Sequence, residues 1–135
     1  MIEKRGTGII IQNEKGQFLL HLRDENAPVL KSQWCMIGGN IEKGEDIEQT
    51  IKREVKEESN LDIKSLRFIK KIPFNNKEIS VFFAKVGNSE NMKLGEGKKL
   101  QFFDKEDLIK LVDNLDYSNI YLKTYKEFVK LLKNQ

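Results

Sequence analysis

The sequence predicts an α/β (α+β) fold in which helices flank a mixed β-sheet. Strand-like segments precede and follow a central amphipathic helix, and two further helical segments come last in the chain. This order of elements is typical of a sheet with helices packed against it. With 135 residues, 39% of them hydrophobic, the chain has the length and apolar content of one domain, and we expect a single domain over residues 1–135.

Short runs rich in Ile, Val, Phe and Leu, bounded by turn residues, predict the strands. They lie at 6–12, 17–23, 63–72, 79–86 and 100–103, and a short apolar segment at 34–37 leads into a Gly-Gly pair. An Asn-Glu-Lys-Gly turn at 13–16 makes the first two strands a hairpin, and a Pro-Phe-Asn-Asn turn at 73–76 separates the third from the fourth. The polar stretches 24–33 and 87–97 are expected to be loops.

Three helices are predicted. The first spans 47–59, where Ile47, Ile51 and Val55 form an i, i+4 row. Asn60 follows it, and asparagine tolerates the left-handed backbone conformation that often ends a helix. Asp104 caps a short helix that runs through 112, and a longer amphipathic helix runs from about 118 to 132.

The composition excludes several classes of protein. The only cysteine, Cys35, rules out an internal disulfide, and with a single histidine no His/Cys metal centre can form. The net charge of +3 is mild and the lysines alternate with acidic residues, so we expect no stable nucleic-acid partner. No segment approaches the roughly 18 apolar residues of a membrane span, and no signal-peptide cleavage site follows the N-terminal residues. We therefore expect a cytoplasmic protein without a membrane partner; its oligomeric state, including a homodimer, is left open.

Three carboxylates on the first predicted helix form the main candidate site. Glu54, Glu57 and Glu58 stand at i, i+3 and i+4, within an arc of about 100° on the helix surface. Glu54 and Glu58 lie beside the apolar row, where burial disfavours the charged form of a carboxylate. A divalent cation removes that cost, and magnesium is commonly held by a few carboxylates together with substrate phosphates. The arrangement therefore predicts a metal site.

A solvated, charged helix face is the alternative interpretation of these glutamates. The helical wheel argues against it, because other residues already supply the solvent face: Glu48, Gln49, Lys52 and Lys56.

Two neighbouring features support the metal site. Arg53 can orient Glu57, four residues on, through a charge-assisted hydrogen bond, although an ordinary surface ion pair would have the same spacing. Before the helix, Gly38 and Gly39 are expected to let the backbone turn sharply, approach a ligand closely and free a carbonyl for the metal.

Together these residues resemble the Nudix box, G-x5-E-x7-R-E-U-x-E-E-x-G-U, where U is aliphatic. The matching positions are Gly39, Glu45, Arg53, Glu54, Val55, Glu57, Glu58 and Leu61. The last glycine of the pattern is replaced by Asn60, which can adopt the same backbone conformation. The resemblance extends over most of the chain, with Ile37 where the family usually has proline. The segment 95–108 looks like the family's second acidic loop and puts Glu96 where many members carry another functional glutamate.

The resemblance implies a Nudix-like α/β/α sandwich and a hydrolase that cuts the diphosphate linkage of a nucleoside diphosphate derivative. It implies binding of Mg²⁺ or Mn²⁺ by Gly38, Glu54, Glu57, Glu58 and Glu96. Metal-activated water would attack phosphorus, and one glutamate, Glu57 or Glu54 with Glu96 as third candidate, would take its proton. The same resemblance places Arg53 in the catalytic set and implies that Glu45 supports the loop before the helix.

The chain most resembles the MutT-like branch, which converts nucleoside triphosphates, oxidised ones included, to a monophosphate and pyrophosphate. Arg23 ends the second strand where such proteins contact the base, and Asn119 could read a purine edge through its paired donor and acceptor. Each has a plainer interpretation: Arg23 as a surface charge and Asn119 as a helix cap. His21 alternates with apolar residues and is expected to be structural.

Two other functions remain open. The same chemistry could act on ADP-ribose or a nucleotide sugar. A nucleotide-sensing module that binds without cutting is ranked lower, because the chain keeps every acidic residue of the box.

Overall fold

The computed structural model describes residues 4–132, so the ends of the predicted domain 1–135 lie outside the described residues. The strands are β1 (Lys4–Gln12), β2 (Phe18–Leu22), β3 (Trp34–Cys35), β4 (Ile37–Asn40), β5 (Ile63–Phe74), β6 (Lys77–Val86) and β7 (Lys99–Phe103). The helices are α1 (Ile47–Ser59), α2 (Lys105–Asn114) and α3 (Ile120–Leu131), with a 3₁₀ turn, η1 (Ser89–Asn91). None of the helices within 4–132 is long and apolar enough to cross a membrane.

The strands form one mixed sheet in the order β3-β2-β1-β6-β5, with β4 paired to β1 and β7 paired to β2. The pair β1–β6 is parallel and the other pairs are antiparallel. This confirms the predicted mixed sheet with flanking helices.

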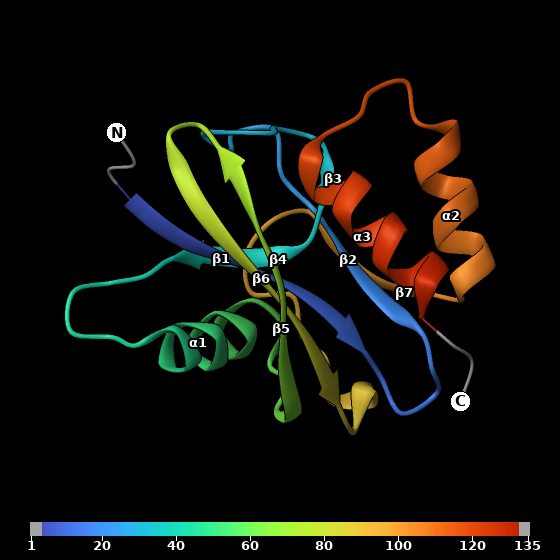
Figure 1. Ribbon diagram of the computed structural model, residues 1–135. Coiled ribbons are helices and arrows are strands. Elements are labelled where there is room, and N and C mark those ends of the chain that lie inside the picture. The colour runs from blue at the N-terminus through green and yellow to red at the C-terminus, as the bar shows by residue number, and fades with distance from the viewer. Residues whose placement is uncertain (1–3, 133–135) are drawn as a thin grey trace.

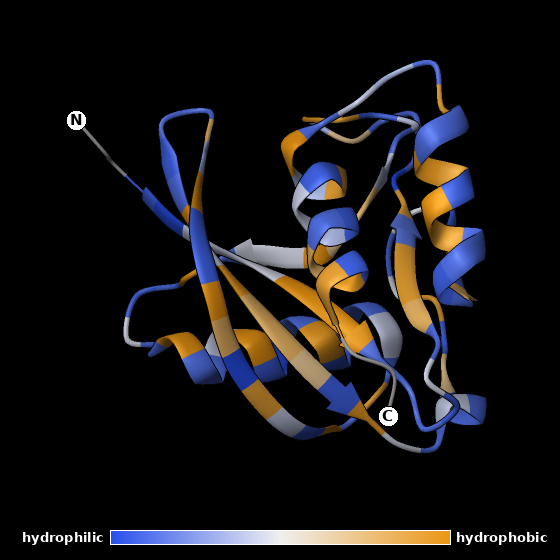
Figure 2. Cartoon of the chain, turned by 45° about the vertical axis from the view of Figure 1, so that its right-hand side comes forward, coloured by the Kyte–Doolittle hydropathy of each residue, from blue (hydrophilic) through white to orange (hydrophobic). Residues whose placement is uncertain are grey.

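Alternation along β1 separates the two faces of the sheet. Ile9 and Ile11 pack on Ile51 and Val55 of α1, while Ile10 points to the opposite core, against α2 and α3. Successive strand residues face opposite sides, so three consecutive isoleucines serve both cores. Figure 1 shows the result, with α1 on one side of the sheet and α2 and α3 on the other. The apolar colour of Figure 2 runs along the strands between these layers, and the predicted α/β/α sandwich is confirmed.

The glycine pair does not form the sharp turn that the sequence suggested. Gly38 and Gly39 lie inside β4, opposite Gly8 and Thr7 of β1. A Cβ at position 38 would overlap the Thr7 carbonyl, and a Cβ at position 39 would overlap the Glu54 carboxylate. Glycine is therefore required here because neighbouring groups come close, and the turn prediction was wrong.

The predicted turn at 73–76 is also shorter in the structure. Pro73 belongs to β5, and only Asn75 and Asn76 make the turn, both with positive φ (48° and 61°). β5 is an edge strand paired with β6 alone, which is where a sheet tolerates proline.

Helix α1 has the predicted bounds, and both ends are capped. Asp46 and Gln49 form a reciprocal capping box at its start. Asn60 adopts the expected left-handed conformation (φ 62°, ψ 16°) at its end. The Asn60 side chain has a second role, because its Nδ2 donates a hydrogen bond of 2.9 Å to the Asn91 carbonyl in the following loop.

Substitution of Asn60 separates these two roles. Asn60→Gly loses the bond to Asn91 but relieves the left-handed backbone, so we expect its free energy of unfolding to stay within about 1 kcal/mol of wild type. Asn60→Ala loses the bond and keeps the strain, so we expect a loss of about 1–3 kcal/mol. Urea denaturation measures both; equal stability of the two variants would contradict this account.

Candidate active site at the carboxylate face of α1

A cavity of about 460 Å³ opens where α1, β4, the end of β2 and the loop before β7 meet. Its lining includes five of the sequence-predicted site residues: Arg23, Gly38, Glu54, Glu58 and Glu96. It also includes His21, Asn40, Glu42 and residues of the 24–28 loop. The structure thus brings together residues that are more than 70 positions apart, from His21 to Glu96.

The three α1 glutamates differ in exposure. The side chains of Glu54 and Glu58 are only 14% and 8% exposed, whereas that of Glu57 is 59% exposed. The prediction that Glu54 and Glu58 lie at the edge of the buried face is confirmed. Glu57 is outside the cavity lining, on the open side of the helix.

Glu58 is the most perturbed carboxyl of the site. Burial raises its pKa to about 9, and the neighbouring Glu54 and Glu96 carboxylates contribute to the rise. Its Oε1 lies 3.9 Å from Nδ1 of His21, and burial lowers the pKa of that imidazole, which favours the neutral ring. Glu58 Oε2 and His21 Nδ1 are both buried without a hydrogen-bond partner among the described residues. Such atoms are costly unless a ligand satisfies them.

Arg53 organises the acidic residues beside the cavity. Its Nε and Nη2 donate to the two carboxylate oxygens of Glu45 at 2.7 and 3.0 Å, a bidentate pair that lowers the pKa of Glu45 to about 2. Its Nη1 donates to Glu54 at 2.8 Å and to Glu57 at 3.4 Å. Arg53 was predicted to orient Glu57; its shorter contacts are instead with Glu45 and Glu54. Glu45 also accepts from the Glu42 N–H, and so supports the loop before α1 as the resemblance implied.

The loop that carries Glu96 is fastened to the end of α1. Gly95 N–H donates to the Glu58 carbonyl at 3.0 Å, and Lys93 N–H donates to the Ser59 carbonyl at 3.0 Å. His21 Nε2 lies 2.8 Å from the Glu96 carbonyl, and in the neutral ring this nitrogen can donate to it. These contacts hold Glu96 beside the α1 carboxylates.

Sequence reasoning assigned His21 a structural role, and its burial and hydrogen bond agree with that role. The sequence did not reveal that His21 lines the cavity of the candidate site, where it contacts the loop that carries Glu96. The signal was weak: a lone histidine at the end of a strand, with its partner a backbone carbonyl 75 residues away. Nothing in a sequence pattern marks a carbonyl as a partner.

The donor set suits a hard divalent cation. Glu54, Glu58 and Glu96 offer carboxylate oxygens, and the unpartnered Glu58 Oε2 is a buried oxygen that a cation would satisfy. Within residues 4–132, no three acidic, histidine or cysteine side chains already converge on one point at metal-binding spacing.

The two predicted base-contacting residues are placed differently. Arg23 lines the cavity, and its Nε donates to the Val29 carbonyl at 2.8 Å. Asn119 caps α3 and is outside the cavity lining. Its Oδ1 accepts from Leu122 N–H, and its Nδ2 donates to Gln33 Oε1 and to the Trp34 carbonyl. The capping interpretation is confirmed, and both N–H groups of the amide are engaged within the protein.

Sequence comparisons point to one family. Residues 3–124 match the family described as NUDIX domain. Nucleoside triphosphatase NudI from Salmonella agona (strain SL483) is 45% identical over 49 residues, which are 36% of this chain and 34% of that protein. The same enzyme from Salmonella schwarzengrund (strain CVM19633) matches to the same extent. The match therefore spans about a third of the length of these relatives.

Solved structures with this fold include the MutT protein from Methanosarcina mazei Go1, with a TM-score of 0.72 and 20% identity over 94% of this chain and 92% of that one. A NUDIX-family hydrolase from Clostridium perfringens has a TM-score of 0.75 and 22% identity over 98% and 100%. An Ap4A hydrolase from C. elegans has a TM-score of 0.67 and 24% identity over 93% and 98%. At these identities the likeness shows the fold.

Substitution of Gly39 tests the close approach of β4 to α1. In Gly39→Ala the new methyl group would displace the Glu54 carboxylate, a flexible side-chain end, so the fold is expected to persist. We expect the affinity for Mn²⁺, measured by calorimetry, to fall about 10- to 100-fold. Gly87→Ala is the matched control, because its methyl group also meets only a flexible side-chain end, that of Lys64. Unchanged Mn²⁺ affinity in Gly39→Ala would remove Glu54 from the metal site.

The raised pKa of Glu58 predicts a pH-dependent stability. Because the folded, metal-free protein holds this proton more tightly than the unfolded chain, the stabilisation is complete below about pH 4.5 and is lost as the pH rises toward about 9. Glu58→Gln, which stays neutral, should therefore be the more stable protein near pH 9, by at least about 1 kcal/mol, and lose this advantage near pH 5. Denaturation curves in EDTA measure the effect; parallel pH profiles of the two proteins would contradict it.

Proposed function

Because the chain belongs to the Nudix family, we propose that it is a divalent-metal-dependent hydrolase that converts a nucleoside triphosphate to a monophosphate and pyrophosphate. The observation that carries the proposal is the cavity lined by partly buried Glu54, buried Glu58 and Glu96, with Glu58 Oε2 unpartnered among the described residues. The name of the Salmonella relatives, nucleoside triphosphatase, supports the choice of substrate class.

We assign the metal, Mg²⁺ or Mn²⁺, to the carboxylates of Glu54, Glu57, Glu58 and Glu96, with the Gly38 carbonyl. When bound, the metal would neutralise phosphate charge and lower the pKa of a coordinated water. Arg53 donates to Glu54 through its Nη1 and to Glu45 through its Nε. These two contacts would keep the Glu54 carboxylate in one orientation while the substrate reacts. The buried walls limit access of bulk water to Glu58.

The general base is one of three glutamates at the cavity and its rim. Glu54 is held in place by Arg53, whose Nη1 lies 2.8 Å from its Oε1. Glu57 is exposed and free to reach a substrate on the open side of α1, and Glu96 approaches from the opposite loop. Glu57 keeps first place because a base must exchange its proton with solvent after each turnover, and its 59% exposure allows that.

The cavity mouth suits a nucleotide. Arg23 and residues of the 24–28 loop line the cavity together with the carboxylates. A cation there can contact the nucleoside or its phosphates, which is the role we assign to Arg23. We assign Asn119 a structural role as the cap of α3. A cytoplasmic location and a single domain over 1–135 stay predictions, and the oligomeric state, a homodimer included, stays open.

A product assay with magnesium tests the function. Nucleoside triphosphates, oxidised purines included, are offered beside ADP-ribose and nucleotide sugars, and the products are separated by chromatography. We expect a monophosphate and pyrophosphate from a triphosphate. Cleavage of sugar-linked substrates only would keep the chemistry and replace the substrate. Absence of any cleavage, in protein that binds Mg²⁺, would favour the nucleotide-sensing module.

Two substitutions on the same helix test the role of Glu57. Because this side chain is largely exposed, Glu57→Gln should leave the melting temperature within a few degrees of wild type and lower kcat by about 10²-fold or more. Glu48→Gln is the matched control, since Glu48 is 63% exposed on the solvent face and pairs only with Lys52 among the described residues. A Glu57→Gln protein as active as Glu48→Gln would exclude Glu57 from the chemistry.

A further inference from the structure

A hollow of about 820 Å³ lies away from the carboxylate cavity and shares none of its lining residues. It opens between the 13–16 hairpin, β5, β6 and the neighbouring ends of α2 and α3. Phe18, Phe83 and Val129 on its walls belong to the core on the α2–α3 face of the sheet. It is therefore on the opposite side of the sheet from α1 and the proposed catalytic residues.

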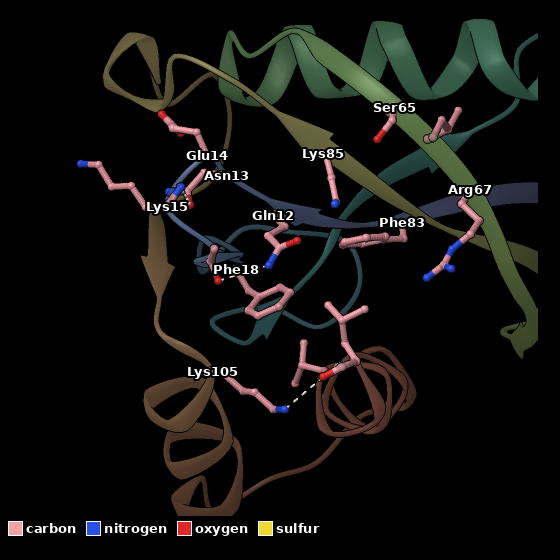
Figure 3. Close-up of a pocket in the computed structure, with 14 residues that line it drawn as sticks. Gln12, Asn13, Glu14, Lys15, Phe18, Ser65, Arg67, Phe83, Lys85 and Lys105 are labelled. Carbon is pink, nitrogen blue, oxygen red and sulfur yellow. Dashed lines mark hydrogen bonds between the residues drawn. The ribbon is translucent and has the colours of Figure 1, made fainter. Parts of the chain in front are cut away.

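Strand register explains why polar groups gather there. Lys85 of β6 lies between Gln12 of β1 and Ser65 of β5, and one step further in, Phe83 is paired with Arg67. Alternate strand residues share a face, so these side chains point to the same side of the sheet. Figure 3 shows Lys85 and Arg67 directed from the sheet into the hollow, and Lys105 directed into it from α2.

The cations of this hollow form no ion pairs within residues 4–132. Among residues 4–132, the ion pairs of lysine and arginine involve Lys52, Arg53, Lys56, Lys71 and Lys126, and none involves Arg67, Lys85 or Lys105. Among the described residues of the lining, Glu14 carries the only carboxylate, and its Oε1 accepts hydrogen bonds of 2.8 Å from both Ser89 N–H and Ser89 Oγ. That carboxylate is engaged elsewhere, and the hollow keeps an excess of positive charge.

Arg67 is held in a definite position. Its Cζ lies 5.6 Å from the Phe83 ring centroid and 5.8 Å from that of Phe128, so the guanidinium rests on aromatic surface. Stacking leaves the N–H groups at the edge of the guanidinium available, and their planar fork matches the oxygens of a phosphate. The Lys105 side chain is also held in place, because its Nζ donates a hydrogen bond of 3.3 Å to the Leu132 carbonyl.

We propose that this hollow is a second ligand site, which binds a small molecule carrying two adjacent phosphates. One phosphate would lie on the Arg67 fork and the next on Lys85, with Gln12 and Ser65 as hydrogen-bonding neighbours. Several cations around one hollow favour a ligand with more than one negative group over a single carboxylate. A volume of about 820 Å³ accommodates a pyrophosphate group with or without a nucleoside attached. The proposal does not depend on the catalytic function.

The test is a titration of the ¹⁵N-labelled protein with inorganic pyrophosphate, and separately with ADP, in EDTA without divalent metal. We expect saturable shifts at the amides of Gln12, Ser65, Phe83 and Lys85, and none at Gly39 or Glu54. Lys85→Gln and Arg67→Gln should each raise the Kd for pyrophosphate about tenfold, since each removes a hydrogen bond to a charged group. Lys110→Gln, the same charge change on exposed α2 surface outside this lining, should leave the Kd unchanged.

The ADP titration distinguishes the two sources of the ligand's phosphates. Tighter binding of ADP than of pyrophosphate would identify a nucleotide as the better ligand, and equal binding would show that only the phosphates are recognised; both outcomes support the site. Shifts confined to the carboxylate cavity, shifts that do not saturate, or an equal loss in Lys110→Gln would overturn it. The same spectra show whether Arg67→Gln is folded. If it is not, the comparison of the pyrophosphate Kd of Lys85→Gln with that of Lys110→Gln decides whether the site exists.

Discussion

The site depends on how closely helix α1 approaches strand β4. Gly39 has no side chain, and the Glu54 carboxylate occupies the space that a Cβ would take. This contact turns one face of α1 into a wall of the cavity, so Glu54 and Glu58 become largely buried while Glu57, on the next part of the helix surface, stays exposed. Three glutamates of the same type thereby acquire different environments, which is how proteins give like groups different roles.

The buried charge is balanced in two ways. Arg53 neutralises one side of the cluster through its bidentate contact with Glu45 and its contact with Glu54. Among residues 4–132, Glu58 forms no ion pair with a lysine or an arginine, and burial together with the neighbouring carboxylates raises its pKa. A buried carboxyl with an unpartnered oxygen is costly, and binding of a divalent cation would provide the missing positive charge.

The sheet separates two regions with opposite charge. On the α1 face, carboxylates surround a cavity that suits a cation. On the α2–α3 face, Arg67, Lys85 and Lys105 surround a larger hollow that suits an anion. Alternation along β1 and β6 produces this division, because adjacent residues of one strand belong to different cores.

Local pattern was enough to predict the mixed sheet, the bounds of α1, the left-handed Asn60 and the burial of Glu54 and Glu58, because periodicity and capping act over a few residues. The spacing of the Nudix box pointed to the family because its residues lie within one short segment of the chain. Tertiary structure alone decided that Gly38 and Gly39 lie in a strand, that Arg53 turns chiefly to Glu45, and that His21 meets the Glu96 carbonyl. Tertiary structure also decided that the Asn119 side chain caps α3, with its Oδ1 accepting a hydrogen bond from Leu122 N–H. These outcomes rest on strand pairing and on contacts between distant segments, whose partners are set by packing of the whole chain and leave no period in the sequence.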